Sequence, residues 1–85
     1  MKIYEFQKNS LEKVVVEITT YQDRGYLNIR VWFDASKGQN TDWRPSHKGI
    51  TLSIDLLPEL KKSIDLAIEF LDSDERDIGK DNPDD

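Results

Sequence analysis

The chain has 85 residues and a mass of 9.9 kDa, which predicts a single domain. It has no cysteine, which excludes disulfides, thiolate metal sites and a cysteine nucleophile, and no apolar run approaches the roughly 20 residues that span a bilayer. Its net charge of −5 argues at first against nucleic-acid binding, since such proteins usually carry a basic excess. However, the whole excess lies in segment 72–85, which has seven acidic and two basic residues, and residues 1–71 are neutral.

Four segments predict β-strands. Residues 3–6 form a short β-like run, and residues 13–21 are rich in β-branched and aromatic types. The tight-turn sequence 22–25, with Gly25 available for a positive φ, leads into residues 26–33. This third segment alternates, with one side formed by Leu27, Ile29 and Val31 and the other by Tyr26, Asn28, Arg30 and Trp32.

The fourth strand is expected within residues 43–52, after a polar loop over 34–42. Pro45 has no N–H to donate to a neighbouring strand. The strand is therefore predicted to lie at a sheet edge or to begin later, near Lys48.

Residues 54–71 predict a helix, with Ser53 or Asp55 as its N-cap and Pro58 in the first turn or just beyond it. Its apolar stripe covers roughly 200°, more than contact with one sheet face requires. The surplus comes from Leu56, Leu66 and Phe70 and suggests a second subunit; the alternative is a helix wrapped by its own sheet and the first strand. The class is α+β (β-β-β-β-α), an antiparallel sheet followed by a helix, in a domain over 1–71. The acidic tail 72–85 is expected to be disordered.

Catalysis has little support in the sequence. The only histidine, His47, adjoins Ser46, and neighbours on a strand cannot point at each other. No residues lie at metal-ligand spacing, and the four glycines are isolated. We therefore expect neither an enzyme nor a cofactor or metal. The opening residues lack the apolar core of a secretory signal, so a cytoplasmic location without membrane contact is expected.

The bases are concentrated in the predicted strands. Residues 13–49 have six bases and four acids, whereas residues 50–71 have four acids and two bases. Both tryptophans, Tyr21, Tyr26 and Phe33 lie in the basic part. Cations beside aromatics on a sheet suit single-stranded nucleic acid, because cations bind phosphates while rings stack on bases. The alternative is that the aromatics form a core and the bases a solvated rim.

Four short motifs in order resemble the C-terminal domain of the positive cofactor 4 (PC4) transcriptional coactivators, above all their prokaryotic relatives. Arg-Pro-x-x-Lys-Gly-Ile-Thr-Leu stands at 44–52, and Ile-Arg-Val-Trp-Phe ends the third strand at 29–33. An aromatic and a Gly-containing turn stand at 21–25, and Phe-x-Lys-Asn-Ser at 6–10. The resemblance covers roughly residues 4–71.

This resemblance implies a homodimer with a curved four-stranded sheet, which binds single-stranded DNA or melted duplex with little sequence preference and serves transcription, replication or repair. The residues it assigns to nucleic acid are Tyr21, Arg24, Arg30, either Trp32 or Phe33, Arg44, Lys48 and, as a weaker match, Lys13. Trp43 is an extra stacking candidate or else packs against its own loop. Gln22 and Asp23 replace a basic residue and a glycine of better-known members.

Two alternatives to DNA binding remain at this point. One is a protein-interaction module, in which exposed aromatics and the acidic tail recruit partners. The other is single-stranded RNA, since stacking does not itself read the 2′-hydroxyl. The tail either keeps the protein soluble, or it competes with DNA for the basic surface or docks partner proteins.

Overall fold

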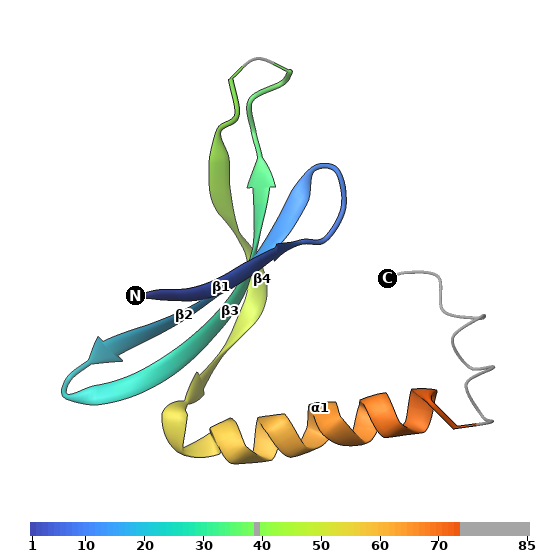
Figure 1. Ribbon diagram of the computed structural model, residues 1–85. Helices are drawn as coiled ribbons and strands as arrows, with labels where there is room; N and C mark the ends of the chain where they lie inside the picture. The colour runs from blue at the N-terminus through green and yellow to red at the C-terminus, as the bar shows by residue number, and fades with distance from the viewer. Residues whose placement is uncertain (39, 74–85) are drawn as a thin grey trace. The chain divides into compact units, whose positions relative to one another are not determined.

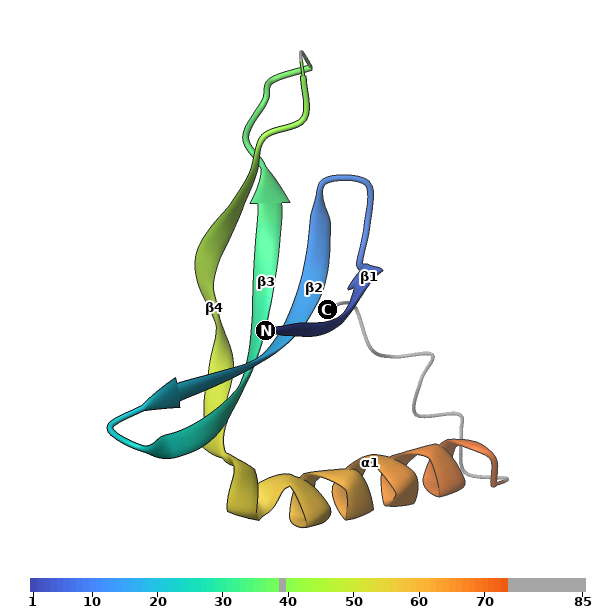
Figure 2. The ribbon, with the colours of Figure 1, turned by 60° about the vertical axis from the view of Figure 1, so that its left-hand side comes forward.

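The computed structural model describes residues 1–38 and 40–73, in which the chain forms a sheet unit up to Asp55 and a helical unit from Leu56 onward. The strands are β1 (Lys2–Gln7), β2 (Glu12–Tyr21), β3 (Arg24–Asp34) and β4 (Trp43–Ser53). They form one antiparallel sheet in the order β1-β2-β3-β4, which twists strongly along its length (Figures 1 and 2). A 3₁₀ turn (Ile54–Leu56) and α1 (Leu57–Leu71) follow. The predicted α+β class and element order are confirmed.

The β2–β3 turn differs in detail from its prediction. Tyr21 pairs with Arg24, so Gln22 and Asp23 alone form the turn, with φ of 51° and 65°. Two successive positive φ values match the right-handed twist of a two-residue hairpin. Gly25 therefore does not supply the positive φ, and its prediction for that role is wrong. It lies inside β3, where an added Cβ would stand 2.9 Å from the side chain of Ile54.

β4 is an edge strand among the described strands, as Pro45 predicts, and it begins at Trp43 rather than near Lys48. Its pairing with β3 is interrupted between Arg30 and Trp32, where residues 46–48 bulge. Gly49 restarts the pairing at φ 155°, and a Cβ there would collide with the backbone carbonyl oxygen of Ile29. The bulge thus requires glycine at 49.

The sheet encloses very little core. Among the described residues only Val15 and Leu27 are buried, with 4% and 8% of their surface exposed. Apolar side chains such as Tyr4, Phe6 and Ile50 remain about half exposed or more. The register places Tyr4, Phe6 and Ile50 on the same side as Leu27, Ile29 and Val31. One face of the sheet is therefore apolar and largely open to solvent.

The helix begins later than predicted. Its N-cap position is Leu56, which already has helical backbone angles and makes no side-chain cap hydrogen bond. The prediction of Asp55 as N-cap is wrong, because the chain enters a 3₁₀ turn at Ile54 and Asp55 lies inside it. The Ser53 hydroxyl accepts the Asp55 N–H at 3.4 Å and so serves the 3₁₀ turn instead. Pro58 lies in the first turn of α1, where its missing N–H costs nothing.

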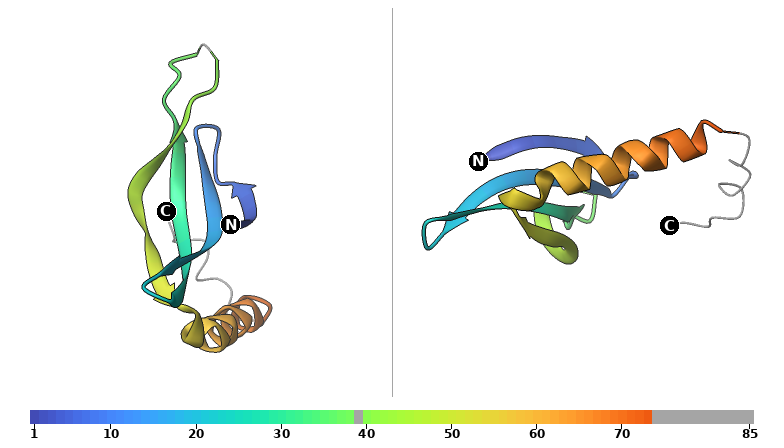
Figure 3. Two further views of the ribbon diagram at one scale, coloured as in Figure 1. Left: turned by 90° about the vertical axis from the view of Figure 1, so that its left-hand side faces the viewer. Right: turned by 90° about the horizontal axis from the view of Figure 1, so that it is seen from below.

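Figure 3 shows α1 as one continuous helix. At its C-terminal end, the Asp72 N–H donates to the carbonyl oxygen of Ile68 at 3.0 Å. Residues 74–85 lie outside the described residues, and with them most of the predicted disordered tail. No helix among the described residues is long and apolar enough to cross a membrane.

Candidate nucleic-acid interface

The strand register divides the candidate residues between two faces of the sheet. We call the face of Arg30 the polar face and the face of Ile29 the apolar face. Paired residues of antiparallel strands point to the same side. The polar face therefore carries Lys13, Tyr21, Arg24, Arg30, Trp32 and Trp43. Phe33 and Arg44 pair with each other on the apolar face, and Lys48 reaches Glu12 on that face. The predicted alternation of residues 26–32 is thus present, but the nine candidates do not form one surface.

At the β2–β3 turn, Tyr21 and Arg24 face each other across the two strands. The Tyr21 side chain is 66% exposed, and Arg24 is exposed as well. In the described part of the chain, no carboxylate lies within ion-pair distance of Arg24. An exposed ring beside an uncompensated cation is the pair of groups that a base and its phosphate require. We call these two residues the turn end of the sheet.

Arg30 is partly used by the fold. Its guanidinium Nη1 donates to the backbone carbonyl of Ser46 at 3.0 Å, within the bulge of β4. The Ser46 hydroxyl in turn donates to the carbonyl of Val31 at 2.7 Å and accepts the Lys48 N–H at 3.1 Å. Arg30 therefore holds the bulge with one nitrogen, and its other N–H groups are available to an anion.

A hydrogen-bonded rung crosses three strands on the polar face, between Tyr26 and Arg30. The Thr51 hydroxyl donates to the Asn28 amide oxygen at 2.6 Å, and the Asn28 amide nitrogen donates to the Thr19 hydroxyl at 2.8 Å. Sequence reasoning did not single out these residues, because only the register brings positions 19, 28 and 51 together. The alternating polar position of Asn28 in β3 was the single signal for it.

Lys13 is enclosed by other side chains. Its ammonium lies 3.3 Å from Glu5 and 4.7 Å above the centre of the Trp43 ring, and its side chain is only 17% exposed. Trp32 lies beside it, in a hollow that Lys13 and Glu5 also line. Lys13 and Trp43 therefore form a cation–π pair within the sheet unit. This contact covers one face of the Trp43 ring.

The two alternatives for the second stacking aromatic point to opposite faces. Trp32 is half-buried on the polar face, whereas Phe33 is 38% exposed on the apolar face. Phe33 lines a hollow of about 560 Å³ together with Leu11 and residues 34–38 of the loop. The more accessible ring is that of Phe33.

The loop after β3 is held by Asp34. Its carboxylate accepts the backbone N–H of Asp42 at 3.0 Å and that of Ser36 at 2.9 Å. These hydrogen bonds, that of Asp42 first, lower the pKa of Asp34. The loop therefore positions Asp42 and, with it, the neighbouring Arg44.

Arg44 and Lys48 each have an acidic neighbour. The Arg44 guanidinium contacts Asp42 Oδ2 through Nη2 at 2.9 Å and Nε at 3.1 Å. The Lys48 ammonium lies 3.9 Å from Glu12, which also binds Asn9 and Lys8. Asn9 and Lys8 lower the pKa of Glu12, and Lys2 and Lys13 lower that of Glu5. We call Lys13, Arg44 and Lys48 the loop end of the sheet.

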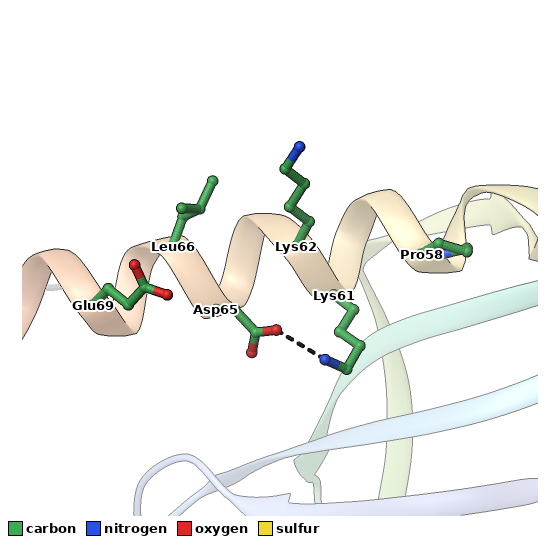
Figure 4. Close-up of a pocket in the computed structure, with 6 residues that line it drawn as sticks. All are labelled: Pro58, Lys61, Lys62, Asp65, Leu66 and Glu69. Atoms are coloured by element: carbon green, nitrogen blue, oxygen red, sulfur yellow. Dashed lines mark hydrogen bonds and ion pairs between the residues drawn. The ribbon is translucent and has the colours of Figure 1, made fainter.

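The predicted dimer residues of the helix are all exposed. Leu56, Leu66 and Phe70 each keep 45% or more of their surface accessible. Figure 4 shows Leu66 and Lys62 projecting from the same side of α1, while Lys61 turns to Asp65 and pairs with it at 2.9 Å. No group of three or more acidic or histidine side chains in the described residues could hold a metal ion.

An open antiparallel sheet with cationic and aromatic side chains on its polar face, followed by one helix, defines a small sheet domain. The chain belongs to the family described as Transcriptional Coactivator p15 (PC4), whose sequence pattern matches residues 8–63. This family binds DNA and acts in transcription or replication. No curated protein matches the chain at a significant level.

Solved structures share the fold. A PC4 homologue from Burkholderia pseudomallei is 24% identical, with a TM-score of 0.68 in its tetragonal crystal form, over 79% of this chain and 94% of that one. Its orthorhombic form gives a TM-score of 0.69, over 79% and 86%. A bacteriophage T5 homologue of PC4, implicated in recombination-dependent DNA replication, is 20% identical, with a TM-score of 0.55 over 94% and 88%.

Proposed function

We propose that the protein binds single-stranded DNA without sequence preference, as a homodimer, through the polar face of its sheet. The observation that carries this proposal is the turn end, where the exposed Tyr21 ring stands opposite the uncompensated cation of Arg24. Arg30 and the Thr19–Asn28–Thr51 rung continue the same face along β3. Membership of a DNA-binding family supports the same conclusion.

Binding combines two physical contributions. Phosphates that bind Arg24 and Arg30 release counterions, so the affinity falls as salt rises, with a slope of about −0.7 per neutralised phosphate for single strands. A base that stacks on Tyr21 contributes about 1–3 kcal/mol, whatever its identity. Neither contribution reads a base edge, so the binding is expected to tolerate every sequence.

Phe33, Arg44 and Lys48 lie on the apolar face of the sheet. Single-stranded DNA that contacts them must therefore follow a different path from DNA that stays on the polar face. Phe33 and Arg44 lie beside the loop, where β3 ends and β4 begins, and Lys48 lies in the bulge of β4. The sheet twists between this region and the turn end (Figure 2). A DNA strand that follows the polar face from Tyr21 and Arg24 must therefore leave that face to reach them. We propose that they form the distal part of the interface and contribute less than the turn end.

The dimer is proposed because the single chain leaves too much apolar surface exposed. Two buried side chains are a small core for about 70 residues, and such domains commonly gain stability by oligomerisation. A second copy would cover the apolar side chains of α1, among them Leu56, Leu66 and Phe70. Sedimentation of Leu66→Gln tests this, with Lys62→Gln on the same side of α1 as the matched control. A dimer in both variants would contradict the assigned interface.

The test of DNA binding is a titration of labelled oligo-dT and of a duplex of the same length at two salt concentrations. Tighter binding of oligo-dT, weakened by salt, is expected. An absence of binding at low salt would contradict the proposal and favour a protein-interaction module. A parallel titration of oligo-U measures the preference for DNA over RNA, since stacking alone does not discriminate between them.

A further inference from the structure

The bases of the loop end differ from those of the turn end in having carboxylates as partners. Arg44 places two guanidinium nitrogens on one oxygen of Asp42, at 2.9 and 3.1 Å. Lys13 lies 3.3 Å from Glu5, and Lys48 lies 3.9 Å from Glu12. Arg44 and Lys48 are nevertheless 63% and 71% exposed, so solvent and solutes can reach them. Their charge is accessible but already compensated within the protein.

The carboxylates are held in place by the fold. Asp42 is fixed through its backbone, whose carbonyl accepts the Ala35 N–H at 2.9 Å and whose N–H donates to Asp34 at 3.0 Å. Glu12 is part of β2 and also accepts hydrogen bonds from Asn9 at 2.8 Å and Lys8 at 3.0 Å. The backbone of Asp42 and the side chain of Glu12 are therefore held next to Arg44 and Lys48 by contacts that do not involve these two bases.

Carboxylate and phosphate oxygens bind Arg and Lys by the same charge-assisted hydrogen bonds. A phosphate can therefore use Arg44 fully only if it displaces Asp42. We propose that Asp42, Glu12 and Glu5 are internal competitors of nucleic-acid phosphate, and that they limit the affinity of the loop end for DNA. This inference rests on the proposed DNA-binding function and concerns the regulation of that same surface.

The competition has a definite signature in the salt dependence. A phosphate that binds a free base releases counterions from the DNA. A phosphate that displaces a carboxylate also exposes that carboxylate, which then attracts a cation from solution. The net release is smaller, so the slope of affinity against salt is shallower than the number of phosphate contacts predicts. Neutralising the carboxylate restores the missing part of the slope.

The decisive variant is Asp42→Asn, because the amide keeps the size of the side chain and the backbone contacts of residue 42 hold the loop. We expect oligo-dT to bind about two- to fivefold more tightly at low salt, the range for one exposed ion pair. The salt slope should steepen by up to about 0.7, one phosphate contact on a single strand. A gain of affinity is informative, because misfolding would cause a loss.

Two controls separate ion-pair release from a change of net charge. Glu17→Gln changes the charge equally on the polar face, and among the described residues Glu17 has no ion pair within 4.0 Å. It is expected to tighten binding less than Asp42→Asn and to leave the slope unchanged. In an Arg44→Gln background, Asp42→Asn should tighten binding no more than Glu17→Gln does and should leave the slope unchanged, because the base it would free is missing.

The outcomes distinguish this inference from the proposed function. If the wild-type protein does not bind oligo-dT at low salt, the proposed function is wrong. If it binds, and Asp42→Asn leaves affinity and slope unchanged, or acts equally with and without Arg44, the competition is wrong while DNA binding stands. Glu12→Gln, which frees Lys48, repeats the test at a second pair.

Discussion

At the β2–β3 turn, Arg24 stands opposite an exposed tyrosine, and no carboxylate of the described residues forms an ion pair with it within 4.0 Å, although Asp23 and Asp55 line the same hollow. At the other end of β3, the guanidinium of Arg44 is held by Asp42. Both arginines are exposed, and the sequence motifs predict both as nucleic-acid contacts. A count of cations therefore overestimates the charge that is available to a phosphate, because part of it is paired with carboxylates. We expect Arg24 to contribute more to DNA binding than Arg44, since the fold leaves its charge without an ion pair.

The largest expected effect is on the bulge that joins the two ends. Gly49→Ala forces a Cβ into the carbonyl oxygen of Ile29 at a φ that suits only glycine. We expect the free energy of unfolding to fall by at least about 2–3 kcal/mol in urea denaturation. Gly38→Ala is the control, because it has a positive φ but no atom within 4 Å of its added Cβ. Equal losses in both variants would contradict the role of the collision.

Tyr21 tests stacking at the turn end. Tyr21→Ala should weaken oligo-dT binding by about 1–3 kcal/mol, the range for one stacked base, without loss of stability because the ring is exposed. Tyr21→Phe keeps the ring and should bind almost as the wild type does. Fluorescence titration measures both. A Phe variant as weak as the Ala variant would assign the role to the hydroxyl instead.

Arg24 and Arg44 compare the two ends directly. Arg24→Gln removes an uncompensated cation and should weaken binding about tenfold at low salt, with a loss of about 0.7 from the salt slope. Arg44→Gln should cost about twofold, since its charge is already paired with Asp42. Equal losses would show that the ion pair does not matter to binding.

Acid should loosen the loop that the Asp34 carboxylate holds. The pKa of Asp34 in the folded protein is lowered by the N–H groups of Asp42 and Ser36, so its ionised form stabilises the loop. This contribution is complete above the ordinary pKa of 3.8 and is lost as the pH falls through the lower folded value. Amide hydrogen exchange at Ser36 and Asp42 should therefore speed up below about pH 4, once corrected for the intrinsic rate. In Asp34→Ala the exchange should be fast at every pH.

The smallest effect is expected from the acidic tail. Removing residues 74–85 deletes six acids and two bases and so takes away a net charge of −4. If the tail competes with DNA for the basic surface, affinity should rise about twofold at low salt and be unchanged at high salt, where the charges are screened. Unchanged affinity at low salt would exclude competition with DNA. The remaining roles of the tail would then be to keep the protein soluble or to dock partner proteins.

Much of the architecture follows from local patterns. The alternation of residues 26–33, the β-branched run at 13–21 and the apolar stripe of the helix specify their elements, because burial of one face imposes a period of two or of 3.6. Pro45 predicted an edge strand for a different local reason, because it has no N–H to donate to a neighbouring strand. Two local predictions failed. A 3₁₀ turn moved the cap position from Asp55 to Leu56, and Gln22 and Asp23 supply the positive φ values that were expected of Gly25.

By itself, the sequence determined the α+β class, the order of its elements, the family, and the residue types that can meet DNA. The tertiary structure decided which of those residues already contact another side chain of the protein and which do not. The register decides that Phe33 and Trp32 lie on opposite faces and that Asn28 forms a rung with Thr19 and Thr51. The register and the bulge at 46–48 also decide which acids lie beside Lys13 and Lys48. The Lys13–Glu5 and Lys48–Glu12 pairs and the cross-strand hydrogen bonds join residues distant in sequence, so they depend on a pairing geometry that no local pattern encodes. Asp42 and Arg44 are close in sequence, but their pair depends on the loop that Asp34 holds.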